Sequence, residues 1–66
     1  MMERVMELFA QGWEVVIGTY WGESLVEESE EIREVFEECE EGEWLYLDVE
    51  ILEEQRRVEL FVQDDE

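Results

Sequence analysis

Apolar and polar residues alternate along two stretches in the C-terminal third of the chain, and this is the clearest structural signal in the sequence. In residues 43–51 (EWLYLDVEI), one side of the alternation is formed by Leu45, Leu47, Val49 and Ile51. In residues 57–63 (RVELFVQ), the corresponding side is formed by Val58, Leu60 and Val62. A turn through residues 53–56 would pair Ile51 with Val58, Val49 with Leu60 and Leu47 with Val62. Because this register keeps the apolar residues on one face, the sequence predicts a β-hairpin.

The N-terminal part of the chain predicts a helix followed by a strand. Residues 2–11 carry apolar residues at helical spacing, and Gly12 suits the position after a helix C-terminus. Residues 13–21 (WEVVIGTYW) are rich in β-branched and aromatic types, which is typical of strands. One face of this strand would carry Trp13, Val15, Ile17 and Trp21, and the other Val16 and Tyr20.

A second helix is predicted in the middle of the chain. Gly22 would break the preceding strand, and Ser24 and Glu27 have the spacing of a capping box. The helix would run from Leu25 to about Glu41, where Gly42 would close it. Its apolar side would be Leu25, Ile32, Val35, Phe36 and Cys39. We interpret Cys39 as a small core residue.

These elements together predict an α+β domain in the order α-β-α-β-β. We expect a three-stranded sheet that contains the C-terminal β-hairpin, with both helices packed on one face. The chain has 66 residues, so we expect residues 1–66 to form a single compact domain. Residues 63–66 would be frayed.

The strongly negative net charge limits the kinds of molecule that this protein is expected to bind. The chain has 22 acidic residues and 4 basic ones, for a net charge of −18. Direct binding to nucleic acid or to an anionic membrane is not expected, because both depend on lysine and arginine. The N-terminus lacks a basic, long apolar signal peptide, and no apolar run is long enough to span a membrane. We therefore expect a cytoplasmic protein.

The acid is concentrated on the predicted second helix. Residues 23–41 would form an element about 28 Å long, with roughly one net negative charge per 3 Å of axis. One strand of B-DNA carries one charge per about 3.4 Å. Like charges four residues apart destabilise a helix by about 0.2–0.5 kcal/mol per pair, so this arrangement indicates a functional reason. The carboxylates expected to line one band are Glu27, Glu30, Glu31, Glu34, Glu37, Glu38 and Glu41.

Through residues 23–43, the chain resembles the small, very acidic α+β inhibitors that phages encode against host nucleases, including anti-CRISPR proteins that mimic DNA. The resemblance lies in length, glutamate content and the absence of catalytic residues. It implies stoichiometric inhibition of a basic nucleic-acid-binding protein or complex in the host cell cytoplasm, with no turnover and no cofactor. The glutamate band would supply the charge contacts, and Trp44 and Tyr46 would serve as apolar anchors.

Other interpretations stay open. The band could be an ordinary solvated face, or the acidity could reflect adaptation to salt. The hairpin aromatics Trp44, Tyr46 and Phe61 could instead make the protein an adaptor or a homodimer. Enzymatic activity is not expected, because exposed glutamates lack the environments that separate two pKa values. The sequence lacks histidine and has one cysteine, so a dedicated metal site is not expected either.

Overall fold

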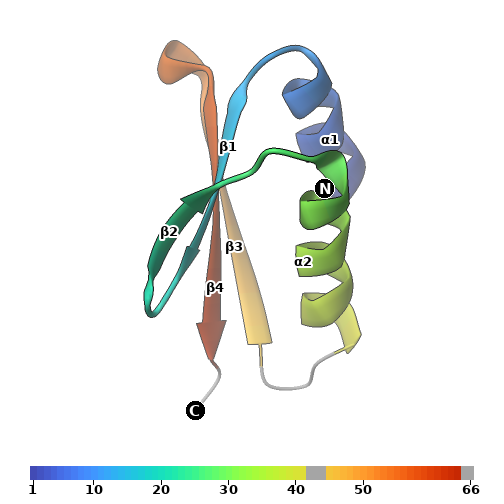
Figure 1. The fold of residues 1–66 in the computed structure, drawn as a ribbon, viewed down its shortest axis with the longest axis vertical. Coiled ribbons are helices and arrows are strands. Elements are labelled where there is room, and N and C mark those ends of the chain that lie inside the picture. Colours follow the sequence, from blue (N-terminus) through green and yellow to red (C-terminus); the bar gives the residue numbers. More distant parts are fainter. Residues whose placement is uncertain (42–44, 65–66) are drawn as a thin grey trace.

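The computed structural model describes residues 1–41 and 45–64, which form two helices and four strands (Figure 1). In chain order the elements are α1 Met2–Ala10, β1 Glu14–Thr19, β2 Gly22–Leu25, α2 Ser29–Glu41, β3 Leu45–Leu52, the short 3-10 helix η1 Glu53–Gln55 and β4 Arg57–Asp64. The order is therefore α-β-β-α-β-β, and the predicted order α-β-α-β-β is wrong.

One sheet contains all four strands, in the order β2-β1-β4-β3. The pairs β1–β2 and β3–β4 are antiparallel hairpins, and β1 lies parallel to β4 at the centre. The predicted α+β class is confirmed. The predicted three-stranded sheet is wrong, because residues 22–25 form a strand, where a break at Gly22 and a helix beginning at Leu25 were predicted.

The additional strand replaces the capping box that was predicted at Ser24 and Glu27. In β2, Ser24 lies opposite Ile17 and Leu25 lies opposite Val16. This ladder gives the backbone hydrogen-bond partners that the exposed first turn of a helix would lack. The long-range pairing therefore overrides the local capping pattern, and α2 begins at Ser29.

A tight turn joins β1 to β2. The Thr19 hydroxyl donates to the Gly22 carbonyl at 3.2 Å and accepts from the Trp21 N–H at 3.2 Å. Gly22 has φ +140°, a backbone conformation that side-chain-bearing residues rarely adopt. Tyr20 and Trp21 consequently lie in this turn, and not in the strand predicted over residues 13–21.

The C-terminal hairpin has the predicted register. Val58 pairs with Ile51, Leu60 with Val49 and Val62 with Leu47. Its turn is η1 followed by Arg56, which has the left-handed values φ 49° and ψ 51°. The strand β4 extends through Asp64, so the prediction that residues 63–66 are frayed is wrong for residues 63 and 64.

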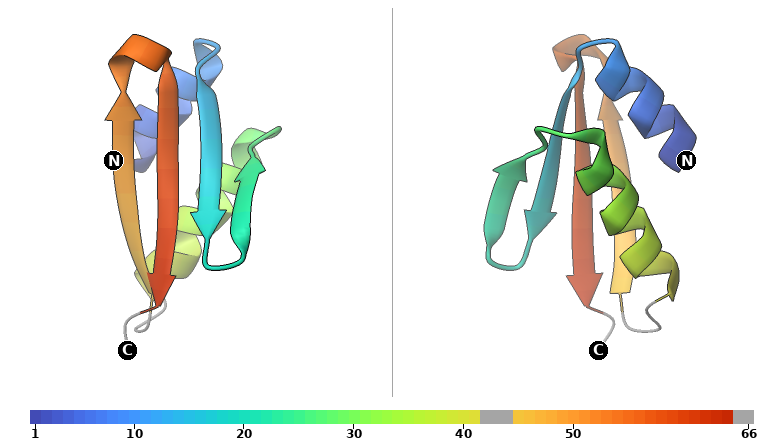
Figure 2. Two further views of the ribbon diagram at one scale, coloured as in Figure 1. Left: turned by 90° about the vertical axis from the view of Figure 1, so that its left-hand side faces the viewer. Right: turned by 45° about the vertical axis from the view of Figure 1, so that its right-hand side comes forward.

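The core lies between the sheet and the two helices, which cover the same face (Figure 2). Helix α1 contributes Val5 and Leu8, and α2 contributes Ile32, which is fully buried. The buried strand and loop residues packed with them are Val15, Val26, Val58 and Leu60. Burying a side chain of this kind stabilises the fold by about 1.5–3 kcal/mol. Neither helix covers the opposite face, which we call the open face.

Candidate functional site

Helix α2 presents a band of carboxylates to solvent. It has 13 residues, of which seven are glutamates and one is an arginine. At about 1.5 Å per residue it is about 20 Å long, which is shorter than the predicted 28 Å. The density of about one net negative charge per 3 Å is nevertheless retained, close to one charge per about 3.4 Å on a DNA strand. The exposed glutamates among the described side chains of α2 are Glu30, Glu31, Glu34, Glu37 and Glu38.

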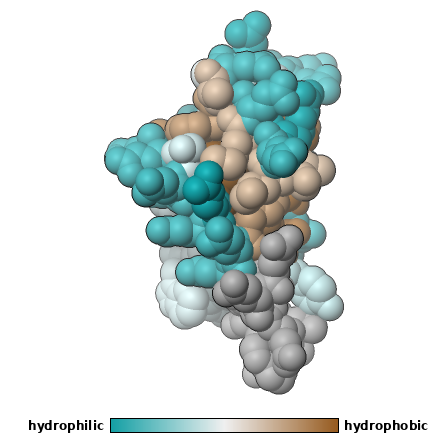
Figure 3. All heavy atoms as spheres, turned by 90° about the vertical axis from the view of Figure 1, so that its right-hand side faces the viewer, coloured by the Kyte–Doolittle hydropathy of each residue, from teal (hydrophilic) through white to brown (hydrophobic). Residues whose placement is uncertain are grey.

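The inward side of α2 fixes which residues reach this band. Ile32 is fully buried, and Val35, Phe36 and Cys39 are half-buried. These residues recur every three or four positions, so the residues between them point outward. Figure 3, which shows the helix-bearing side of the molecule, has hydrophilic surface interrupted by an apolar strip.

The N-terminus of α2 uses one of the predicted contact residues as a cap. Glu31 accepts hydrogen bonds from the backbone N–H groups of Glu27 at 2.7 Å and Glu28 at 3.0 Å. This is the glutamate half of a capping box, located four residues after Glu27, where it was predicted. The Glu28 and Glu27 N–H groups hold the pKa of the Glu31 carboxyl below its ordinary value. Glu31 therefore has a structural role in addition to its place in the band.

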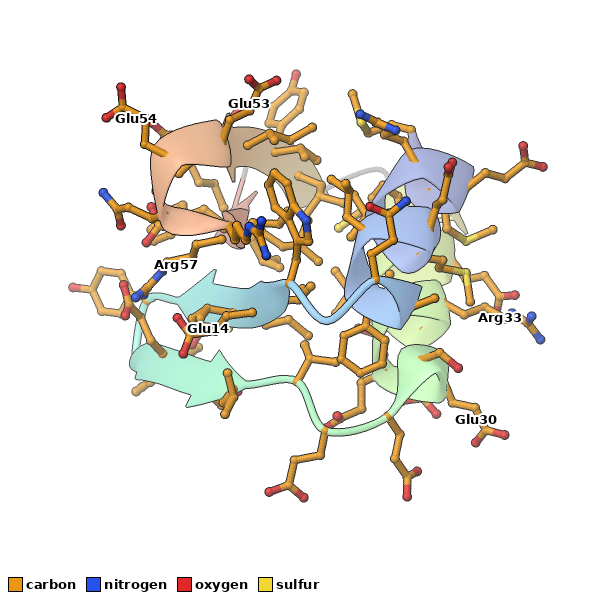
Figure 4. The ribbon with its side chains drawn as sticks, turned by 90° about the horizontal axis from the view of Figure 1, so that it is seen from above. Glu14, Glu30, Arg33, Glu53, Glu54 and Arg57 are labelled. Atoms are coloured by element: carbon orange, nitrogen blue, oxygen red, sulfur yellow. The ribbon has the colours of Figure 1, made fainter. Side chains whose placement is uncertain are left out.

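Very little positive charge lies near the band. Arg33 is the only basic residue of α2 and makes no ion pair with the described residues. The last turn of the helix has no basic residue to offset the negative end of the helix dipole. Figure 4 shows Glu30 and Arg33 pointing outward from the helix side, away from Glu14 and Arg57.

The predicted apolar anchors are not all brought to the band. Tyr46 is 59% exposed, and its partner in the ladder is Gln63, which places it on the open face. It therefore lies on the opposite side of the sheet from α2. Trp44 lies outside the described residues, as does the side chain of Glu41, although α2 includes Glu41.

The open face contains a groove that sequence reasoning missed. Its volume is about 280 Å³, and its apolar part is formed by Val16, Gly18, Leu60 and Phe61. The carboxylates that line it are Glu23, Asp48, Glu50 and Glu59. The alternation of β3 and β4 predicts that Asp48, Glu50 and Glu59 share one face of the sheet. The position of Glu23 was not predicted, because residues 22–25 were not recognised as a strand.

One arginine holds several of these acids. The guanidinium of Arg57 lies 3.2 Å from Glu14, 3.4 Å from Glu59 and 3.8 Å from Glu23. In the view of Figure 4, Arg57 and Glu14 lie together on the side away from the helices. Arg57 is the only basic residue in the four described strands, so the open face has a net negative charge.

The β1–β2 turn carries two aromatic side chains that the sequence analysis did not single out. Tyr20 and Trp21 are each 90% exposed, and their rings form a T-shaped pair with centroids 5.7 Å apart. Their exposure was not predicted, because residues 13–21 were expected to form one continuous strand, whereas β1 ends at Thr19. Exposed aromatics on a tight turn are suited to contact a partner.

The remaining candidate chemistry is sparse. Burial, followed by the charge of Glu38, raises the pKa of the Cys39 thiol. No group of three or more cysteine and acidic side chains in the described part of the chain is arranged to hold a metal ion. Neither described helix is long and apolar enough to cross a membrane.

No family model, curated protein or solved structure matches the chain.

Proposed function

We propose that the protein is a non-enzymatic, acidic binding protein that mimics the charge of nucleic acid and blocks the cationic nucleic-acid site of a partner. The observation that carries the proposal is the outward side of α2, where Glu30, Glu34 and Glu37 are all exposed and no described ion pair neutralises them. A basic groove would supply the missing counter-charge. The resemblance to phage inhibitors suggests a CRISPR or other host nuclease complex in the host cytoplasm as the partner.

The physical basis of this interaction is electrostatic. Complementary charge accelerates association and excludes wrong partners more than it adds raw affinity. A band of carboxylates on a helix also keeps its spacing, because the backbone fixes the positions of Glu30, Glu34 and Glu37 along one side. The partner would lose its nucleic acid because the two ligands compete for the same lysine and arginine side chains.

Capture from a nuclease-treated bacterial lysate tests the proposal. The bait is the wild type beside Glu30→Gln/Glu34→Gln, which removes two charges from the band. The matched control is Glu53→Gln/Glu54→Gln, which removes two exposed charges from η1, on the other side of the view in Figure 4. Binding is compared at about 0.1 M and about 1 M salt, between which the Debye length falls from about 10 Å to about 3 Å.

The expected result is retention of basic nucleic-acid-binding proteins at low salt by the wild type and the η1 control. Salt and added duplex DNA should both release them, and the band variant should retain less. Equal retention by both variants, or capture that persists at high salt and in excess DNA, contradicts the proposal.

An adaptor or homodimer that binds through hairpin aromatics is the second candidate. It is favoured by the exposure of Tyr46 at 59% and of Phe61 at 41%. Binding of this kind depends on apolar contact, so it should change little with salt. The same capture experiment therefore separates the two candidates.

A further inference from the structure

The open face of the sheet is a second surface that neither described helix covers, and it lies on the opposite side of the molecule from the α2 band (Figure 2). Its groove is lined by the apolar residues Val16, Gly18, Leu60 and Phe61 and by carboxylates from three strands. Because the sheet separates this groove from α2, a flat surface that covers the band does not reach it (Figure 2). It therefore needs its own explanation.

Two acids in this groove are in an unfavourable position in the free protein. Glu50 and Glu59 are direct partners in the β3–β4 ladder, and like charges opposite each other destabilise a sheet. Arg57 lies 3.4 Å from Glu59, but it makes no ion pair with Glu50 among the described residues. An added cation at this point would relieve the repulsion.

An aromatic ring lies beside these acids. Phe61 pairs with Gly18 across β1 and β4 and remains 41% exposed. A Cβ atom at position 18 would lie 3.0 Å from Cδ2 of Phe61, so the absence of a side chain at Gly18 allows the ring to lie close to β1. The ring of Phe61 therefore lies against β1 at Gly18, and part of the ring surface stays exposed to solvent.

We propose that the open face is a docking surface for an arginine-bearing segment of a basic partner protein. The planar guanidinium stacks on aromatic rings and pairs with carboxylates in a bidentate manner, and the groove presents both kinds of group. An arginine over Phe61 would place its charge beside Glu50 and Asp48. Asp48 is held in place by the Gln63 amide, which donates to it at 2.9 Å.

Charge argues against a second copy of this chain as the occupant. Each copy has a net charge of −18, and its open face carries acids from every strand, with Arg57 as the one basic residue in the described strands. Pairing two such faces would bring like charges together. The assignment does not depend on the α2 band, because the groove and the band are separate surfaces.

The test uses a short acetylated peptide of alternating arginine and serine, with lysine and citrulline versions as controls. Binding is followed by NMR on isotope-labelled full-length protein. The informative variant is Glu50→Gln, and its matched control is Glu53→Gln in the exposed η1. Neither substitution removes a buried apolar group, so both variants should fold, which the NMR spectra also verify.

We expect the arginine peptide to shift the signals of Gly18, Phe61 and Gln63, and the citrulline peptide to leave them unchanged. Glu50→Gln should weaken binding about 2- to 5-fold, as is typical of one exposed charge pair, while Glu53→Gln should not. Replacing Phe61 with leucine should cost the arginine peptide about 2- to 5-fold and the lysine peptide less.

Three results would overturn the assignment. The first is peptide shifts confined to α2, which would leave the proposed function standing and remove this surface. The second is an equal effect of Glu50→Gln and Glu53→Gln. The third is a dimer in sedimentation measurements whose interface covers Phe61, which would show that a second copy is the occupant.

Discussion

Replacing Arg57 with methionine removes the one cation that holds the acids of the open face together. The guanidinium lies 3.2 Å from Glu14, 3.4 Å from Glu59 and 3.8 Å from Glu23, and the Arg57 side chain is 29% exposed. Methionine keeps an unbranched apolar stem of similar reach, so the packing of that stem against the sheet is largely retained. The substitution therefore isolates the charge.

The size of the effect follows from these contacts. An exposed ion pair contributes about 0.2–1 kcal/mol, and the contact with Glu23 is the longest of the three. We expect the free energy of unfolding to fall by about 1–2 kcal/mol at low salt. For a domain of this size, that corresponds to a loss of about 5–15 °C in Tm. At about 1 M salt, where the Debye length is about 3 Å, most of the loss should disappear.

Urea unfolding followed by circular dichroism, at about 0.1 M and about 1 M salt, measures this effect. Arg33→Met is the matched control, because it changes the net charge equally and Arg33 makes no ion pair with the described residues. A loss that is equal at both salt concentrations would refute the reasoning, since it would show that Arg57 acts through packing. Equal losses in both variants would show that only net charge matters.

Three further predictions follow from individual side chains. Replacing Glu31 with glutamine should destabilise α2 at neutral pH, because its ionised carboxylate accepts two backbone N–H groups. These contacts lower the pKa of Glu31 in the folded state, so the extra stability of the wild type over the variant should be full above the unfolded-state pKa and should be lost as the pH falls through the folded-state pKa. Denaturant unfolding of both proteins across acidic pH measures this difference in the free energy of unfolding. A difference that stays constant with pH would contradict the role of the Glu31 carboxylate as a cap. Cys39, whose pKa is raised, should react with iodoacetamide more slowly at mildly alkaline pH than a free cysteine does, and equal rates would argue against its burial. Ile32→Ala should lower the free energy of unfolding by about 2–5 kcal/mol in thermal unfolding, since Ile32 is fully buried, and a loss below about 1 kcal/mol would mean that the core re-forms around it.

The C-terminal hairpin was predictable because two independent features of the sequence agree on it. Leu47, Val49 and Ile51 are spaced two residues apart, so in a strand they lie on the same face. A turn through residues 53–56 pairs them with the apolar residues Val62, Leu60 and Val58. Any shift by one residue would move these side chains to the open face. Register was therefore fixed locally.

The start of α2 was not predictable in the same way. Ser24 and Glu27 have the spacing of a capping box, but Ser24 is paired with Ile17 in β2. Choosing between the two requires knowing that Gly22 permits a tight turn, and that the free edge of β1 is available. This depends on the sheet as a whole, which local propensity does not describe.

The acidic band could be predicted from the sequence and the groove could not, again because one depends on local periodicity and the other on the whole sheet. Helical periodicity alone places Glu30, Glu34 and Glu37 on one side of α2, and their exposure agrees with it. The groove combines Glu23 from β2 with residues of β1, β3 and β4. Its composition depends on strand order, so it could not be read from any one segment.

Salt should act in opposite directions on the free protein and on its proposed complex. In the free protein, Glu30, Glu34 and Glu38 repel one another along α2, and each such pair costs about 0.2–0.5 kcal/mol. Screening removes part of this cost, so the free energy of unfolding should rise with salt. The same screening weakens attraction to a basic partner, and the complex should dissociate over the same range. A protein adapted only to salt would show the first effect alone, whereas a complex whose affinity changes little with salt would indicate apolar contact through Tyr46 and Phe61.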